Sequence, residues 1–243
     1  MTTPQQRAAD VRALVGAEPE PGESGTEVGW LQQLCAAVVR HLPASGAGVT
    51  VMTEAGVGAV VAASDTTARS LADVQFLVGQ GPCLDAYARR SPVLEPCLDD
   101  EVARRWPAYT AAARALGAAA VFALPLQVGA ARLGVLEVYR IEPGWLAPSS
   151  LALALTFAEV ALDALLDGQA RSGQDRPPAG VGLAMNPHYV IYQAQGMVTV
   201  DLGISLTDAM TRLRAHAFAA DRPLSEVAAD VVAGLLRLVV DDG

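Results

Sequence analysis

The chain has 243 residues, of which 52% are hydrophobic, so it can form one large domain or two smaller ones around an ample apolar core. All 17 basic residues are arginine and 26 residues are acidic, which gives a net charge of -9. No segment has the strongly basic balance typical of nucleic-acid-binding proteins, and residues 181–243 carry 4 arginines against 7 acidic residues. This balance argues against a broad basic surface for nucleic acid.

Cysteine usage and apolar runs indicate the compartment. The three cysteines form no CxxC spacing and follow no export signal, so we expect a cytoplasmic protein with reduced thiols. The apolar runs at 115–128 and 151–166 contain turn-forming or charged residues and fall short of the roughly 20 residues that span a bilayer. We therefore expect no membrane segment.

Taken in order, residues 1–25 are rich in Pro, Glu, Gly and Ser and are expected to form a disordered arm. Helical and strand patterns follow from residue 26. Helices are predicted at 26–41, from an N-cap at 64–65 through 73 or 75, and at 83–89, 107–116 and 148–166. Strands are predicted at 47–53, 57–63, 93–94, 119–128 and 132–139. This order predicts an α+β domain, an antiparallel sheet with packed helices, over 26–167.

The segment 168–182 is rich in Gly, Pro and polar residues and reads as a linker. Residues 183–243 then have only helical patterns, three in number. Ser205 is expected to cap the second of these helices together with Asp208, and Asp221 the third, with Pro223 in its first turn. The chain is thus predicted to end in an all-α domain.

The front domain contains a set of recognisable motifs, which are Ser64-Asp65, Gln75, Gly81-Pro82-Cys83-Leu84-Asp85-Ala86, Arg105-Trp106-Pro107, Leu124-Pro125-Leu126 and Gly134-Val135-Leu136. Through these residues the domain resembles a GAF domain of the kind found in actinobacterial regulators. The resemblance implies a central sheet of the six-stranded type with a ligand pocket on one face, and dimerisation through flanking helices.

The back domain also contains recognisable motifs, which are Gln193-Ala194-Gln195-Gly196-Met197, Gly203-Ile204-Ser205, Asp208-Ala209, Leu213-Arg214, Ala217, Leu224 and Val227-Ala228. Through these residues the domain resembles an ANTAR domain, the RNA-binding module of transcription antiterminators. The resemblance implies a dimer that binds paired RNA hairpins and stops a terminator from forming. ANTAR sequences usually have Lys at the position of Gln195, so this chain lacks one expected positive charge.

Candidate RNA-binding residues lie on and beyond the second helix of the back domain. Thr211, Arg214 and Phe218 share a stripe at helical spacing, and a guanidinium beside hydroxyls and an aromatic ring can bind phosphate and stack on a base. Arg222 lies near the start of the third helix, where phosphate is favoured, and Gln195 holds the usual Lys position. The alternative is that Phe218 packs on the first helix and Arg214 covers it with its stem.

Candidate pocket residues in the front domain are Trp106, Gln75 and Cys83. Trp106 could form an apolar or stacking wall, or be a core residue. Cys83 lies near a helix start, which favours a reactive thiol, and one GAF-fold enzyme type reduces free methionine sulfoxide with cysteines; a buried, inert thiol is the alternative. His41 is the only histidine of this domain, so we expect no metal and no cofactor.

Three functional hypotheses remain open. The first is a homodimeric, non-enzymatic regulator whose front domain senses a small ligand or signal and whose back domain binds tandem RNA hairpins. The second is a dimerisation or protein-docking regulator whose back domain no longer binds RNA. The third is a thiol reductase that uses Cys83.

Overall fold

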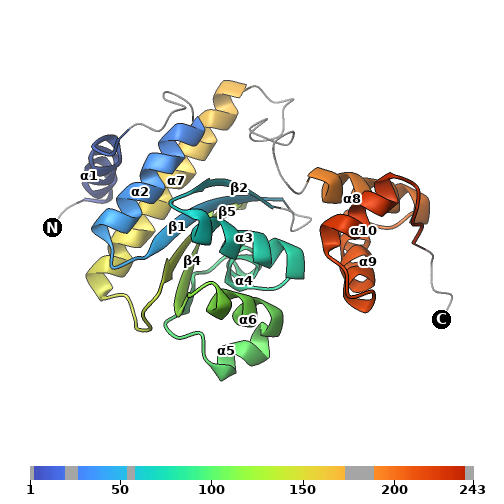
Figure 1. Ribbon diagram of the computed structural model, residues 1–243. Coiled ribbons are helices and arrows are strands. Elements are labelled where there is room, and N and C mark those ends of the chain that lie inside the picture. Colours follow the sequence, from blue (N-terminus) through green and yellow to red (C-terminus); the bar gives the residue numbers. More distant parts are fainter. Residues whose placement is uncertain (1–2, 20–26, 54–57, 173–188, 239–243) are drawn as a thin grey trace. The chain divides into compact units, whose positions relative to one another are not determined.

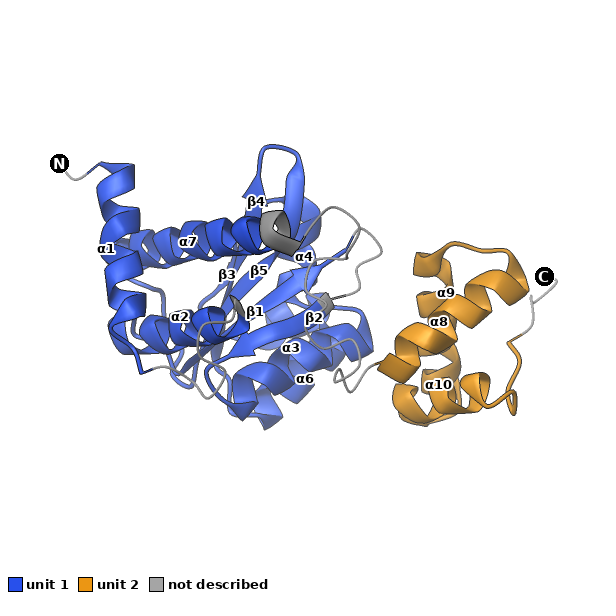
Figure 2. Ribbon diagram, turned by 90° about the horizontal axis from the view of Figure 1, so that it is seen from above, with its two compact units in different colours: residues 1–181 blue, residues 182–243 orange. Residues whose placement is uncertain are grey.

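The computed structural model describes residues 3–19, 27–53, 58–172 and 189–238 (Figure 1). Contacts divide the chain into two compact units, residues 1–181 and residues 182–243 (Figure 2). The first unit contains α1 (Pro4–Gly16), α2 (Glu27–His41), β1 (Gly46–Met52), β2 (Gly58–Ala63), α3 (Thr66–Val78), α4 (Pro82–Arg89), β3 (Val93–Glu95), α5 (Asp100–Arg105), α6 (Pro107–Ala115), β4 (Ala120–Val128), β5 (Ala131–Arg140) and α7 (Pro148–Ser172). The second contains α8 (Tyr189–Leu202), α9 (Leu206–Ala219) and α10 (Leu224–Val232).

The sheet of the first unit has the order β2-β1-β5-β4-β3, and every neighbouring pair is antiparallel. The predicted hairpin around Gly129 forms, with Val128 opposite Ala131. The described part of the sheet has five strands, one fewer than the GAF resemblance implies. The connection expected at 54–56 lies outside the described residues. The predicted α+β architecture is confirmed.

Helices cover both faces of this sheet, and the central strand β5 shows how the sequence divides between them (Figure 1). Leu136 and Val138 belong to a core shared with α2 and α7, whereas Val135 and Tyr139 belong to a second core shared with α3, α4 and α6. Successive side chains of a strand point to opposite faces. Glu137 therefore faces the second core, under α3 and α4.

Helix α1 corrects the prediction of a disordered arm over residues 1–25. Val11 and Val15 are fully buried against the first core, and Arg12 Nη2 lies 2.5 Å from Asp163 Oδ2 on α7. The buried carboxylate of Glu18 then pairs with Arg40 on α2 at 2.8 Å. The prediction failed because it was based on the polar composition of the segment. Val11 and Val15, at i and i+4, lie on one face of the helix, and this face packs against α2 and α7.

Helix α7 is longer than predicted and reaches Ser172, so residues 168–172 of the expected linker are helical. The remainder of the linker lies outside the described residues. Residues 148–168 are long and apolar enough to span a membrane by length and composition alone. However, Ala154, Phe157 and Ala161 are fully buried in the first core, as in the core helix of a soluble protein, so this evidence for a membrane span is weak.

The three helices of the second unit pack against one another. Ser205 caps α9 as predicted: its Oγ accepts a hydrogen bond from the Asp208 backbone N–H at 3.1 Å and donates one to the Asp208 carboxylate at 2.7 Å. The predicted cap at Asp221 is wrong, because Pro223 is the N-cap residue of α10 and Asp221 has a positive φ of 51° in the preceding turn. Residues 189–238 therefore form a small helical bundle.

Candidate functional site

Two of the three predicted pocket residues of the first unit meet in a buried cluster. The Gln75 carboxamide on α3 accepts a hydrogen bond from the Cys83 backbone N–H at 2.7 Å, at the start of α4. Both side chains then donate to the same oxygen, Oε2 of Glu137 on β5, and the Cys83 Sγ lies 2.7 Å from it. This buried cluster of Gln75, Cys83 and Glu137 ties α3 and α4 to the centre of the sheet.

Gly81 allows Gln75 to occupy this place. A Cβ atom at residue 81 would lie 2.5 Å from Cγ and Oε1 of Gln75, and the φ of 147° at Gly81 is one that residues with side chains rarely adopt. Pro82 then opens α4 at a position where no backbone donor is needed. The Gly-Pro-Cys motif thus aims the Cys83 amide at Gln75.

Burial dominates the electrostatics of the cluster. It raises the pKa of the Glu137 carboxyl above its ordinary value, and hydrogen bonds from Cys83 and Gln75 only partly oppose this effect. Burial and then the nearby Glu137 raise the pKa of the Cys83 thiol well above its ordinary value. A thiol held protonated is a poor nucleophile, so the geometry argues against the thiol-enzyme hypothesis.

Next to this cluster is a small cavity with space for about one water molecule. Gln75 and Cys83 form part of its wall, together with the apolar side chains of Met52, Val60 and Phe76. Thr50, on β1, also lines it, and its Oγ1 is buried without a hydrogen-bond partner among the described residues. The wall of this cavity is therefore mixed, because Thr50, Asp73, Gln75 and Cys83 contribute polar groups beside the apolar side chains.

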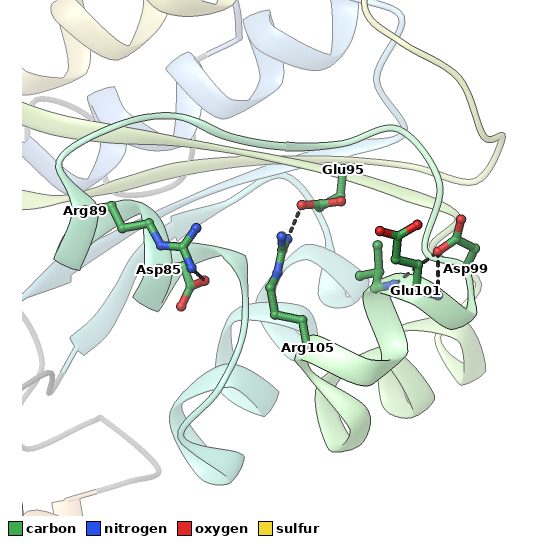
Figure 3. Close-up of polar contacts among 7 residues, drawn as sticks. Asp85, Arg89, Glu95, Asp99, Glu101 and Arg105 are labelled. Carbon is green, nitrogen blue, oxygen red and sulfur yellow. Dashed lines mark hydrogen bonds and ion pairs between the residues drawn. The ribbon is translucent and has the colours of Figure 1, made fainter.

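Trp106 does not line this cavity. It is 3% exposed, packs edge-on against Tyr109 with ring centroids 6.2 Å apart, and lies under the Arg105 guanidinium, 3.8 Å from the ring centroid. Arg105 also pairs with Glu95, and Figure 3 shows these two side chains pointing toward each other. The core alternative for Trp106 is thus the one that the structure supports.

An open surface hollow lies beside Arg105, lined by Glu95, Cys97, Asp99 and Glu101 among others. Asp99 caps α5 there, accepting hydrogen bonds from the backbone N–H groups of Glu101 and Val102 (Figure 3). The charged groups that form these bonds and ion pairs serve the local fold. The hollow is nevertheless lined mainly by charged side chains of both signs.

In the second unit, α9 presents the predicted stripe in part. The Phe218 side chain is 90% exposed, so it does not pack on α8, as the alternative supposed. Thr211 is also exposed, and it lies about one helical turn before Arg214 and two turns before Phe218. Its hydroxyl donates a hydrogen bond to the Thr207 carbonyl at 2.9 Å. An aromatic ring fully open to solvent is available for stacking.

Arg214 is partly buried, and its Nε is among the buried atoms. Burial lowers the pKa of its guanidinium to about 10, with Tyr192 on α8 acting in the opposite direction. The group remains charged at neutral pH, and part of its stem covers the bundle. Its placement therefore supports a packing role, and the guanidinium on the α9 stripe is partly withdrawn from solvent.

The remaining two predicted RNA contacts are engaged inside the unit. Arg222 lies 2.8 Å from Asp230 Oδ2 and 3.6 Å from Glu226 Oε2, and these carboxylates raise its pKa. Gln195 is 3% exposed and donates to the Leu206 carbonyl at 2.7 Å, which links α8 to the start of α9. Gln195 thus has a structural contact, and the expectation that it faces RNA is not supported by its position.

Glu137 is the site residue that sequence reasoning missed. Its signal was present in the strand pattern, because a single acid lies between Leu136 and Val138 in an otherwise apolar central strand. A charged residue at an inward position of such a strand is rare unless it has partners. The two partners, Gln75 and Cys83, had both been singled out for other reasons.

Comparisons with known proteins agree with this division. Residues 183–232 match the family model of the ANTAR domain. The chain is similar to the solved GAF domain of a phosphoenolpyruvate-protein phosphotransferase (ptsP) from Coxiella burnetii, with 17% identity, a TM-score of 0.53, and coverage of 70% of this chain and 96% of that chain. It is also similar to the GAF domain of the Acinetobacter phosphoenolpyruvate-protein phosphotransferase, with 10% identity, a TM-score of 0.51, and coverage of 71% and 99%.

A weaker likeness is to a free methionine-R-sulfoxide reductase from Neisseria meningitidis, with 13% identity, a TM-score of 0.45, and coverage of 66% of this chain and 87% of that chain. This likeness is too weak to bear on activity. No curated protein matches the chain. The matches at higher TM-score establish the fold of the N-terminal unit, and the family model identifies the C-terminal one.

Proposed function

Because the chain joins a unit of the GAF fold to an ANTAR domain, we propose that it is a signal-responsive RNA-binding transcription antiterminator. The ANTAR domain binds paired hairpins in a nascent transcript and permits transcription through a terminator. The GAF unit controls this binding in response to a small ligand or signal. The protein acts in the cytoplasm as a homodimer and catalyses no reaction.

The observation that carries this proposal is the solvent-exposed Phe218 in the unit that matches the ANTAR model. Exposing a large aromatic ring at 90% is unfavourable for a stable monomer surface, and it suits stacking on an unpaired base of a hairpin loop. Arg214 lies one turn before Phe218 on the same helix. This pair can bind one base and one neighbouring phosphate.

The acidic balance of the chain sets the character of the interface. With few arginines in residues 181–243, affinity must depend on stacking and on a few specific phosphate contacts rather than on a broad basic surface. We therefore expect a shallow dependence of RNA affinity on salt. Single-stranded loops, whose bases are unstacked, are the part of the hairpin that such a surface recognises best.

The test is titration of a tandem-hairpin RNA pool with the full chain. Selection of bound RNA provides the target, and the Arg214→Ala, Arg222→Ala double variant is then compared with the wild type. The two single variants are measured as well, and Arg237→Ala is the matched control for each, because it removes one positive charge from an exposed position outside the stripe. Wild-type affinity in the double variant would reject this site.

The alternative is a dimerisation or protein-docking bundle that has lost RNA binding. Two observations favour it: Arg222 is already engaged by Asp230 and Glu226, and Gln195 replaces the usual lysine inside the bundle. Absence of binding to every hairpin in the pool, together with a stable dimer in sedimentation experiments, would support this alternative.

A further inference from the structure

Two arginines of the first unit, Arg90 and Arg132, both adjoin Gln127. Arg90 is the C-cap residue of α4, and Arg132 lies opposite Gln127 in the paired strands β4 and β5. The Gln127 side-chain amide donates a hydrogen bond to the Arg90 carbonyl oxygen at 2.9 Å. Gln127 therefore holds the end of α4 against the strand pair and brings the two arginines to one region of the surface.

Neither Arg90 nor Arg132 has an acidic partner in the part of the chain that the structure describes, although 14 acidic residues outnumber 9 arginines over residues 26–167. Arg89, next to Arg90, is bound by Asp85 one turn earlier at 2.9 Å (Figure 3). Neighbouring cations without an anion repel each other. This region is therefore suited to a partner that supplies negative charge. The arginines of the first unit that do form ion pairs are Arg12, Arg40, Arg89, Arg105, Arg114 and Arg140.

The Arg132 guanidinium is held in place by an aromatic ring. Its central carbon lies 4.7 Å from the ring centroid of Tyr87 on α4, and its Nη1 donates a long hydrogen bond to the Tyr87 carbonyl oxygen at 3.5 Å. Tyr87 is 6% exposed, so the ring itself belongs to the core. A guanidinium has five N–H donors, and an aromatic face does not neutralise its charge. Arg132 is therefore positioned, partly exposed and able to bind an anion.

Arg90 has a backbone conformation that glycine adopts more readily. Its φ of 56° and ψ of 34° are left-handed, and glycine is the residue usually found where a helix ends in this way. A residue with a side chain loses stability here, and the hydrogen bond from Gln127 helps to hold the conformation. The Arg90 side chain is exposed. An exposed guanidinium kept beside Arg132 at a cost in stability indicates a binding role.

We propose that Arg90 and Arg132 bind phosphate groups of the RNA backbone. This inference rests on the proposed antitermination function, and it adds an RNA contact on the first unit. Pairs of guanidinium N–H groups match the oxygens of a phosphate, and such contacts add affinity without reading the base sequence. In the second unit Arg222 is held by Asp230 and Glu226. The first unit thus supplies phosphate contacts that are scarce in the second.

A polyanion fits this surface better than a small anion does. Arg90 and Arg132 line neither the small cavity beside Gln75 nor the hollow beside Arg105, so a single phosphate ion would be held on an open surface. A chain of phosphates can contact both arginines at once, and each contact raises the effective concentration for the other. Among polyanions, RNA is favoured over an acidic protein segment because the second unit matches the ANTAR family model.

The experiment measures how RNA affinity depends on salt. The full chain is titrated at several salt concentrations with the hairpin RNA obtained by the selection above, as the wild type and as the Arg90→Ala, Arg132→Ala double variant. We expect the affinity of the double variant at low salt to fall roughly tenfold. The slope of log affinity against log salt concentration should become shallower by about 1.4–1.8, because each phosphate contact contributes about 0.7–0.9. An unchanged slope would overturn the inference.

The matched control is the Arg69→Ala, Arg104→Ala double variant, which removes two exposed arginines from other positions of the same unit. It changes the net charge by the same amount, so it measures the general electrostatic effect of the unit on RNA. We expect a clearly smaller change in slope than for Arg90→Ala, Arg132→Ala. Equal changes in the two double variants would show that net charge is responsible, and the assignment of a local contact would be wrong.

A single variant separates binding from folding. Arg90→Gly places at this left-handed position the residue that prefers it, so the unfolding temperature should rise or stay unchanged. RNA affinity at low salt should nevertheless fall by roughly threefold, and the salt slope should become shallower by about 0.7–0.9. A variant at least as stable as the wild type does not lose binding through misfolding. Wild-type affinity in Arg90→Gly would refute the role of Arg90.

The same titrations distinguish this inference from the proposed function. If the wild type binds the RNA and Phe218→Ala weakens binding, but the arginine variants do not, the proposed function stands and only this inference fails. If the wild type binds no RNA, both fail. Polyglutamate is the probe for an acidic protein segment. Polyglutamate binding that is as tight as RNA binding, and that is lost in Arg90→Ala, Arg132→Ala, would assign the surface to such a segment and overturn the inference.

Discussion

Two ionisable side chains, Glu137 in the first unit and Arg222 in the second, have partners of opposite kinds. In the first unit an acid is buried with neutral donors only, from Gln75 and Cys83. In the second unit Arg222 lies at the surface with two acids of its own helix region beside it. In the first region burial raises the pKa of the Glu137 carboxyl and so favours its neutral form, whereas in the second region the cation already has anions. A ligand of the second region must therefore compete with these anions for Arg222.

The largest effect on stability is expected from Gln75→Ala. This change removes the acceptor of the Cys83 N–H and one donor to Glu137, and it leaves a hole beside Gly81. Each buried polar group left unpaired costs about 1–3 kcal/mol, so the free energy of unfolding should fall by about 2–4 kcal/mol in urea denaturation. Gln33→Ala, which loses one hydrogen bond to the Glu18 carbonyl, is the milder control. Equal losses would show that the cluster has no special role.

Phe218→Ala should weaken RNA binding without a loss of stability, the reverse of the result expected for Gln75→Ala. The ring is exposed, so its removal should leave thermal stability unchanged, while RNA affinity falls by about 1–3 kcal/mol per lost base stack, or roughly fivefold to 150-fold. Leu235→Ala removes a side chain that is 79% exposed on the same unit and serves as the control. Unchanged affinity in Phe218→Ala would remove the observation on which the proposed function depends.

The pH dependence of stability should reveal Glu137. Burial raises its folded-state pKa above the ordinary value of 4.5, so the folded state binds more protons than the unfolded state between these two pKa values. This contribution is fully present below pH 4.5 and is lost as the pH rises through the folded pKa. Glu137→Gln should therefore become less destabilising, relative to the wild type, as the pH rises across this window. A pH-independent difference in urea denaturation would show that Glu137 has an ordinary pKa.

The smallest effect is expected from Asp230→Asn. Freeing Arg222 from its 2.8 Å partner should raise hairpin affinity by roughly threefold to tenfold at low salt and make it more salt-dependent. Asp201→Asn removes the same charge from an exposed position of α8 and should have a weaker effect. If the two variants bind equally, or if the gain persists when Arg222 is also replaced by Ala, Asp230 does not compete with RNA for Arg222.

The sequence predicted most of the fold because its patterns were local. The hairpin around Gly129, the cap at Ser205 and the order of helices and strands all follow from neighbouring residues, and they are confirmed. Helix α5 was missed because its six residues give too short a pattern. Helix α1 was missed because its two buried valines acquire meaning only from the surface of α2 and α7.

The site was harder to predict because it depends on long-range contacts. Gln75 and Cys83 were named from a family motif, but Glu137, 54 residues beyond Cys83, joins them only through the register of β5. Trp106 was predicted either as a pocket wall or as a core residue, and its burial beside Tyr109 agrees with the core alternative. Phe218 and Gln195 were both predicted as RNA contacts, but only Phe218 is exposed, whereas Gln195 is buried. The sequence alone does not show this difference.

Helix α1 also determines how the protein should be cut for experiments. A chain shortened to begin at residue 27, where the domain pattern starts, would remove the cover over part of α2 and α7 and leave Asp163 and Arg40 without their partners. The apolar surface uncovered beside Val11 and Val15 is of the kind that causes association. A dimer seen only in such a shortened protein would therefore be a product of the truncation, and oligomeric state should be measured on the full chain.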